Sequence, residues 1–375
     1  MYKKKYVVFF SALSMAVSAP VFANPVSPAP SSQDSAYISI PSLNPGFNMG
    51  VAALWLRPGA SNLTYVIYNR ALPLLQPSWS EQELNPAFSP AFEIQMGYVP
   101  KNSGGMDIDL DWTHLRSETV TESIAAATSS DFLGPDYDIG PDGSNIRNAT
   151  GSAQFSADVI NVDAGQHVLF GRRLNIRFFG GLSTGFLKEN LTDTYSGTAT
   201  AVAASGSIPA TAAGPFSVTQ YESSRFSGAG PRIGVDANYR MRCGFGFIGE
   251  GAITALFGTM ASNTNYLGTS QTLINNGYAV PNPQYIADQH VFQVIPGFDT
   301  KLGVDYKRAL SQTTTLVVST GYQAAVYINA ISQYLPGSLV QTKGLSTGSL
   351  YVETMNHILS NYSMQGPFLK LSLEF

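Results

Sequence analysis

The feature that most constrains this chain is a two-residue alternation of apolar and polar side chains, which recurs in separate segments until the last residue. This period predicts β-strands with two chemically different faces. The segments are Phe47–Leu56, Ala91–Val99, Met106–Leu115, Ile160–Phe170, Leu174–Phe186, Ala229–Met241, Phe245–Phe257, Val294–Tyr306, Thr314–Ile328 and Met364–Phe375. We therefore expect an all-β protein with about ten strands, twelve being the alternative, and Asn62–Asn69 extending the first hairpin.

The connections between these segments alternate in length. Short turns are expected at Pro100–Gly105, Gly171–Arg173, Arg242–Gly244 and Lys307–Gln312. Long polar loops are expected at 58–90, 116–153, 188–222, 259–290 and 329–360. Short periplasmic turns and long extracellular loops are typical of outer-membrane barrels. The pattern predicts an antiparallel up-and-down transmembrane β-barrel over residues 46–375.

The beginning of the chain predicts export. Lys3, Lys4 and Lys5 precede an apolar run, and Val21-Phe22-Ala23 carries the small residues that signal peptidase requires. A membrane anchor is the alternative, but the run is shorter than the ~20 residues of a spanning helix. Residues 1–23 are expected to be a signal peptide and 24–45, rich in Pro and Ser, a flexible periplasmic tail. An even number of strands would leave both termini in the periplasm.

Charge parity indicates which face meets lipid. In each alternating segment one face is nearly free of charge, as expected when a lipid-facing charge costs about 2–4 kcal/mol. The opposite face should line the lumen. The predicted lumen residues are Asp107, Asp109, Asp111, Arg177, Arg232, Asp236, Arg240, Asp299, Lys301, Asp305, Lys370 and Glu374.

Aromatic residues near the strand ends predict interfacial girdles, formed by Trp55, Trp112, Tyr239, Tyr306 and Phe375. Phe375 also closes an amphipathic final strand. This ending resembles the signal by which the barrel assembly machinery recognises its substrates. Outer-membrane lipid and lipopolysaccharide are therefore expected partners.

Several function classes are disfavoured by composition. The formal net charge is −4, so no basic field for nucleic acid is expected. One cysteine and four histidines make a metal cluster improbable, and no cofactor is expected. The alternative of a barrel protease or lipid hydrolase depends on His114, His290 and His357 near the outer rim, with Asp288 close to His290. No catalytic motif supports it, so no catalytic residue is predicted.

Several motifs resemble the Legionella-type pore-forming major outer-membrane protein family. They are Asp111-Trp112-Thr113-His114, the run from Gly171 to Gly181, the run from Arg225 to Ala237, Leu302-Gly303-Val304-Asp305-Tyr306, Gly321-Tyr322-Gln323-Ala324 and Gly366-Pro367-Phe368-Leu369. The resemblance implies an outer-membrane porin with surface roles in attachment. It also implies interchain disulfides, for which Cys243 is the candidate; such a disulfide would join copies of the chain into an oligomer, and the sequence leaves the oligomeric state open.

The function expected from these features is passive diffusion of ions and small polar solutes through the barrel. About ten strands enclose a narrow interior that side chains can largely fill. An adhesin acting through the long loops, with little conductance, is therefore the first alternative, and the rim enzyme is the second.

Overall fold

The computed structural model describes residues 38–70, 78–128, 131–135, 146–199, 214–270, 284–287, 290–311, 313–341 and 350–375. The predicted signal peptide lies outside the described residues, as does most of the predicted tail. Within the last part of that tail, Ile38–Ser39 form a short strand, β1, which pairs with the end of a longer strand at Phe170 and Leu169.

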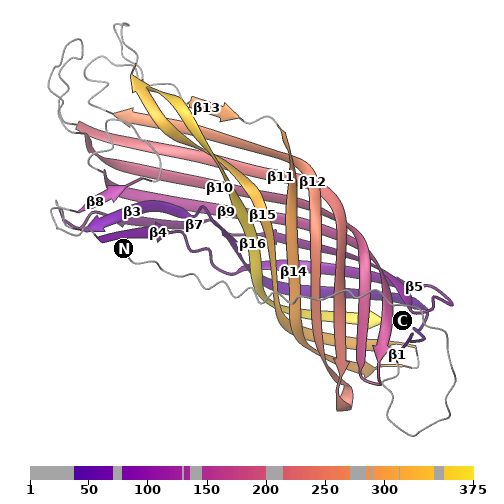
Figure 1. Cartoon of the computed structure of the whole chain (residues 1–375). Helices are drawn as coiled ribbons and strands as arrows, with labels where there is room; N and C mark the ends of the chain where they lie inside the picture. Colours follow the sequence, from indigo (N-terminus) through magenta and orange to yellow (C-terminus); the bar gives the residue numbers. More distant parts are fainter. Residues whose placement is uncertain are drawn as a thin grey trace, which may run out of the picture. The chain divides into compact units, whose positions relative to one another are not determined.

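Ten long strands form a closed antiparallel ring, which confirms the predicted barrel and strand number (Figure 1). In ring order they are β2 (Gly46–Ala60), β5 (Ser89–Val99), β6 (Met106–Arg116), β9 (Ile146–Phe170), β10 (Leu174–Ala199), β11 (Gly214–Arg240), β12 (Phe245–Ser270), β14 (Val291–Ala309), β15 (Thr315–Gln341) and β16 (Leu350–Glu374). The pairing of β16 with β2, with Leu371 opposite Val51, closes the ring.

The remaining short strands lie in the long connections. They are β3 (Thr64–Arg70), β4 (Ser78–Glu83), β7 (Val120–Ala125), β8 (Phe132–Gly134) and β13 (Gln284–Ala287). The prediction that Asn62–Asn69 extends the first hairpin was wrong, because β2 ends at Ala60 and β3 pairs with β4 and β8 instead. Among the described residues, no helix has the length and apolarity needed to cross a membrane.

The four short turns lie at one end of the barrel, called here the short-turn end. Pro100–Gly105 and Gly171–Arg173 connect their strands as predicted, and Gly104, Gly105 and Gly171 adopt positive φ angles that suit glycine. Arg242–Gly244 forms a single 3₁₀ turn. The fourth turn is shorter than predicted, since β14 continues to Ala309.

Much of the sequence predicted as long loops is strand. For example, β9 begins at Ile146 and not at Ile160, and β10 ends at Ala199 and not at Phe186. The alternation continues in these extensions, but with Ser, Thr and Asn on the outer face. A prediction that requires apolar residues on that face therefore ends each strand too early. The connections at this long-connection end are long, as predicted, and are built largely on extended strands.

The outer face of the strands changes chemistry along their length. On β10, Phe178, Leu182 and Phe186 are exposed on the outside, whereas Lys188 and Asn190 occupy the next outward positions. An apolar band therefore surrounds the ring near the short-turn end. Its exposed members include Val51, Ile108, Leu110, Val162, Phe178, Leu182, Ile233, Ile253, Phe298, Leu302, Leu369 and Leu371.

The interior changes in the opposite sense. Within the band the interior is charged. At the edge of the band nearer the long-connection end, which we call its upper edge, the interior becomes an apolar layer. The members of this layer are at most 2% exposed: Leu54, Leu56, Leu115, Phe155, Leu187, Phe226, Leu256 and Ile295. The apolar core continues into the extensions through residues such as Ala153, Leu191, Tyr195 and Met260. On the inner face of the extensions these apolar residues are interspersed with buried polar ones such as Glu189, Gln220 and Thr264.

An arginine placed in the apolar band tests this assignment. Ile233→Arg on β11 should lower the unfolding free energy in lipid vesicles by about 2–4 kcal/mol, because Ile233 points outward within the band and is 62% exposed. Thr192→Arg, outward on the extension of β10, is the matched control and should change it by less than about 0.5 kcal/mol. Urea titration of the refolded barrel measures both. Equal losses for the two variants would contradict the lipid assignment.

Candidate functional site: the charged interior

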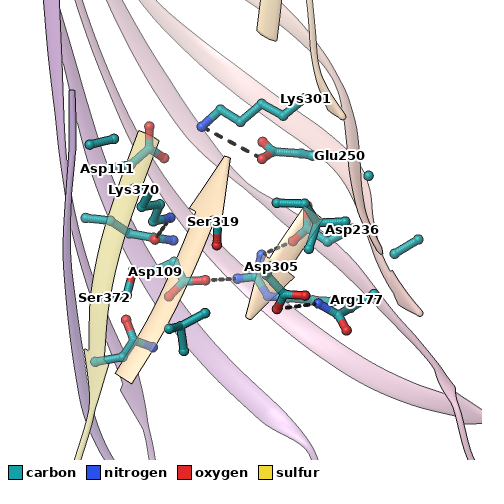
Figure 2. A pocket seen from close by; sticks show the side chains of 18 of the residues that line it. Asp109, Asp111, Arg177, Asp236, Glu250, Lys301, Asp305, Ser319, Lys370 and Ser372 are labelled. Atoms are coloured by element: carbon teal, nitrogen blue, oxygen red, sulfur yellow. Dashed lines mark hydrogen bonds and ion pairs between the residues drawn. The ribbon is translucent and has the colours of Figure 1, made fainter. Parts of the chain in front are cut away.

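A cavity of about 300 Å³ lies in the charged part of the barrel interior. Eleven of the twelve predicted lumen residues line it, and the twelfth, Asp299, lines a smaller adjoining pocket of about 40 Å³. Figure 2 shows side chains from several strands converging on this space. The ring therefore brings together residues that are up to 267 positions apart between Asp107 and Glu374.

Arg177 organises the half of the cavity nearer the short-turn end. Its guanidinium contacts Asp107 at 2.8 Å, Asp109 at 2.9 Å and Asp236 at 2.9 Å. Asp236 is directly opposite on β11. Asp107 is reached across β9, where Gly165 provides the room: a Cβ there would lie 2.2 Å from the Arg177 Nε atom. A glycine in the strand interior is thus required by the close approach of a charged side chain.

Arg232 forms the second cluster by the same arrangement. It pairs with Asp163, Glu250 at 3.0 Å and Asp299 at 2.9 Å. Gly181 on β10 is the register partner of both Arg232 on β11 and Asp163 on β9. The Arg232–Asp163 ion pair therefore also spans an intervening strand at the position of a glycine. Buried carboxylates and guanidinium groups form ion pairs with one another here, which is the condition for tolerating them away from bulk water.

Phe179 lies between the two arginines. The guanidinium carbon of Arg177 is 5.1 Å from the ring centroid, and that of Arg232 is 4.8 Å away. Both distances suit a cation–π contact. The ring therefore fixes the separation of the two clusters along β10 and β11.

Lys301 extends the network across the barrel. Its Nζ is 2.7 Å from Glu93 on β5 and 3.9 Å from Glu250, which also contacts Arg232 (Figure 2). Nearer the short-turn end Arg240 pairs with Asp305 at 2.9 Å. Lys370 donates a hydrogen bond to Gln95, and Lys307 pairs with Glu374 at 2.5 Å.

Five ionisable residues of this interior were not predicted from the sequence: Glu93, Asp163, His167, Glu250 and Lys307. His167 Nε2 lies 3.1 Å from the Asp107 carboxylate, to which it donates in the tautomer protonated at Nε2. Alternation parity was the signal that could have found them. Lys307 has the parity of the predicted lumen residues on β14, and the other four have the opposite parity to exposed apolar residues of their own strands, namely Met96, Val162 and Ile253. With them, the lining has ten carboxylates and six Arg or Lys side chains.

A segment of the β2–β5 connection, which includes β3, fills the interior of the extension. Tyr65 and Val66 are at most 3% exposed, and the Tyr195 hydroxyl donates to the Tyr65 carbonyl from the inner face of β10. Gly151 on β9 leaves room for Tyr65, because a Cβ there would lie 2.6 Å from the Tyr65 Cβ. Residues 62–70, which we call the inner segment, thus lie above the apolar layer.

Glu189 anchors the inner segment from the wall of β10, outside the apolar band. Asn62 Nδ2 donates to Glu189 Oε2 at 2.9 Å, while Oε1 has no hydrogen-bond partner among the described residues. Burial in this apolar surrounding raises the pKa of Glu189 to about 7, an effect that the Asn62 hydrogen bond only partly opposes. The carboxyl group is therefore favoured in its neutral form.

The predicted girdle residues are all exposed on the outer face. Trp55 and Trp112 lie at the upper edge of the apolar band, and Tyr239, Tyr306 and Phe375 lie at the short-turn end. Trp112 also donates from its indole nitrogen to Asp158 at 3.1 Å. Cys243, the candidate for an interchain disulfide, is an exposed free thiol in the turn between β11 and β12.

The histidines considered for a rim enzyme do not come together. His114 lies on the outer wall with its Nδ1 2.7 Å from Asp158, and His357 on β16 contacts the Ser332 hydroxyl at 3.0 Å and stacks on Tyr334. Asp288 lies outside the described residues, so its predicted relation to His290 stays a prediction. Within the described part of the chain, no group of three or more His, Cys, Asp or Glu side chains could hold a metal ion.

The raised pKa of Glu189 predicts a pH-dependent docking of the inner segment. A folded-state pKa near 7, above the usual 4.5, means that docking is strongest below about pH 4.5 and weakens as the pH rises through 7. The loss should be at most roughly 3 kcal/mol. Hydrogen exchange of residues 62–70, corrected for intrinsic rates, should reveal more frequent opening at pH 8 than at pH 5.

Glu189→Gln is the control for this experiment, because the amide is neutral at every pH and keeps the shape. The variant should show nearly the same opening free energy at both pH values. An equally large pH effect in the variant and the unmodified protein would show that Glu189 is not responsible.

Comparisons with known proteins give one family and several distant structures. A family model described as Legionella pneumophila major outer membrane protein precursor matches residues 39–375. No curated protein matches the chain. Among solved structures, the outer-membrane protease OmpT from Escherichia coli is 9% identical with a TM-score of 0.36, covering 88% of this chain and 96% of its own.

Two transporters are also similar at this level. The Pseudomonas putida toluene transporter TodX is 7% identical with a TM-score of 0.24, covering 88% of this chain and 90% of its own. The Ralstonia pickettii toluene transporter TbuX is 8% identical with a TM-score of 0.22, covering 89% and 90%. At such scores these likenesses carry no argument about mechanism.

Proposed function

We propose that this chain, which belongs to the Legionella pneumophila major outer membrane protein family, is a narrow channel for small ions and polar solutes that is closed in the described conformation. The family match establishes an outer-membrane protein. The channel itself is our inference from the interior of the ring. The observation that supports it most directly is the cavity enclosed by the ten strands, which is lined by polar side chains and by charged side chains of both signs.

The charged cavity has the properties of a vestibule at the short-turn end. Glu374 and Arg240, near that end, have side chains that are 45% and 32% exposed, whereas Arg232, deeper in the barrel, is 4% exposed. Fixed charges of both signs would let small cations and anions enter by exchanging contacts with the wall. The surplus of carboxylates favours cations.

The apolar layer is the barrier. Leu56, Leu115, Leu256 and Ile295 are fully buried, and side chains from opposite sides of the ring fill the space. An ion crossing such a region would lose its hydration without gaining polar partners. Passage therefore requires displacement of these side chains and of the inner segment above them, and conductance should be small and intermittent.

We further propose that the short-turn end and both termini face the periplasm and that the long-connection end faces outward. This orientation follows the general arrangement of bacterial outer-membrane barrels. It would place the charged vestibule on the periplasmic side and the inner segment toward the exterior.

Truncating the barrier tests the channel. Phe226→Ala with Leu256→Ala removes two side chains from the apolar layer, which leaves space for water, so single-channel conductance in planar bilayers should rise at least about threefold above that of the unmodified protein. Phe257→Ala, next to Leu256 but 46% exposed on the lipid face, is the matched control and should leave conductance unchanged.

Heat-modifiable gel mobility verifies that each variant is folded. If the unmodified protein gives no channel events and the double variant also gives none, the channel proposal is wrong. Equal increases from the double variant and from Phe257→Ala would show that the recorded events do not pass through the interior.

A second candidate function, surface attachment, is supported by the packed extensions. Leu191, Tyr195 and Tyr266 are at most 5% exposed, so the extended strands form a rigid, independently packed base for the outermost connections. Rigid elements hold binding loops in fixed positions. This arrangement suits display of residues toward another surface.

Replacement of residues 200–213 and 271–283 by short Gly–Ser linkers tests this second function. Attachment to host cells should fall at least about tenfold while conductance is kept, because the exchanged residues are not part of the strands that form the ring. Exchange of the turn at 100–105 for a linker of equal length is the control. Unchanged attachment after the first exchange would contradict the role.

A further inference from the structure

Three cations lie in one outward-facing row across four neighbouring strands. Arg116 on β6 is opposite Ser156 on β9, Ser156 is opposite Lys188 on β10, and Lys188 is opposite Arg225 on β11. Residues directly opposite in a sheet point to the same side. All three cations are exposed, while their chain neighbours Leu115, Leu187 and Phe226 are buried inside.

This row is unfavourable without an anion. Lys188 and Arg225 are direct cross-strand neighbours, and like charges in that arrangement destabilise a sheet. Within the described part of the chain, none of the three cations forms an ion pair with a carboxylate, although twelve ion pairs occur elsewhere. The arrangement contrasts with the interior, where Arg177 and Arg232 each have three carboxylate partners.

The surroundings of the row form a shallow cavity of about 260 Å³ on the outer wall. Arg116, Lys188, Gln154 and Asn190 line it with His114 and Asp158. Asp158 is the one carboxylate of this lining and is engaged by its neighbours, since His114 lies 2.7 Å from it and the Trp112 indole donates to it at 3.1 Å. The cations remain available to an anion. The Gln154 amide also donates to the Ser117 carbonyl at 3.5 Å, and the Asn190 amide oxygen accepts from the Ser223 hydroxyl at 2.8 Å, which leaves Gln154 Oε1 and Asn190 Nδ2 for a ligand.

The height of the row relative to the apolar band identifies the environment of that anion. On β10, Lys188 occupies the first outward position above Phe186, which is 49% exposed at the edge of the band. On β6, Arg116 lies two outward positions above Trp112, a girdle residue. Cations at this level meet lipid headgroups, while the aromatic side chains beneath them meet the acyl chains.

From these observations we propose that Arg116, Lys188 and Arg225 form a binding site for the phosphate groups of a phosphorylated glycolipid in the outer leaflet. Arginine forks bind phosphate oxygens in pairs, and lysine adds a point charge. The amides of Gln154 and Asn190 suit sugar hydroxyls next to the phosphate. The site rests on the proposed orientation, which places the long-connection end at the outer leaflet, and is independent of conduction.

A lipid anchor is part of the proposal. The row is open to solvent and spread over four strands, so a free phosphate would be bound weakly and screened by salt. A phosphate held at the membrane surface by acyl chains that pack on Phe186 and Trp112 would instead have a high local concentration. The site is thus specific for anchored phosphate.

Native mass spectrometry of the refolded barrel titrated with diphosphoryl lipid A tests the site. The neutralised variant R116Q/K188Q/R225Q should bind at least about tenfold more weakly than the unmodified protein. The variant K101Q/R173Q/R308Q carries the same change of charge at exposed positions of the short-turn end and should bind within about twofold of it. Heat-modifiable mobility verifies folding, and the single variant Lys188→Glu provides a second measurement.

Two further probes separate the sources of binding. Dephosphorylated lipid A should bind the unmodified protein no better than diphosphoryl lipid A binds the neutralised variant, and inorganic phosphate at equal ionic strength should not compete. Equal affinity of the unmodified and neutralised barrels, equal losses from both triple variants, or full binding of dephosphorylated lipid A would each overturn the proposal. Conductance should be unaltered by neutralisation, so this result is distinguishable from failure of the channel.

Discussion

The closure of the ring by the pairing of β16 with β2 is the constraint on which the rest depends. In hydrocarbon an unpaired N–H or C=O costs several kcal/mol, so a sheet can cross a membrane only without free edges. Pairing from Asn48 through Leu54 with Glu374 through Phe368 removes the last two edges. Once the ring is closed, alternate side chains must face either hydrocarbon or the enclosed interior, and every other feature follows from that division.

The division explains why the strands carry two different patterns. Along β10 the outside is apolar up to Phe186 and polar from Lys188 onward, while the inside changes from Arg177 to Leu187 and Leu191. Each face thus changes chemistry at the level where the solvent on the outside changes from lipid to water. The extension is held together by hydrophobic burial and by buried polar contacts such as that of Gln333 with Glu222, and the band by the backbone hydrogen bonds of the ring and by ion pairs.

Sequence alternation was sufficient to predict the ring of ten strands, the four short turns and the side on which Asp107, Arg232 and Lys301 lie. It was insufficient for the extensions, because Ser, Thr and Asn on an outer strand face have the composition of a loop. Sequence alternation also could not predict which interior side chains form ion pairs with one another. Arg177 reaches Asp107 across a third strand only because position 165 is glycine, and such contacts depend on register between strands that are distant in sequence.

The ion network has a further consequence for register. A buried ion pair contributes little net stability compared with well-packed apolar side chains, so stability alone does not account for the interior charges. A slip of one residue would, however, reverse every side chain on a strand. Slipping β10 would move Arg177 into hydrocarbon and bring Phe178 inside, leaving Asp107, Asp109 and Asp236 without their cation. Apolar residues on both faces would carry no such penalty. The charged interior therefore selects a single register for strands whose lipid faces are chemically alike. The polar cavity is the part of the interior that these paired side chains leave unfilled.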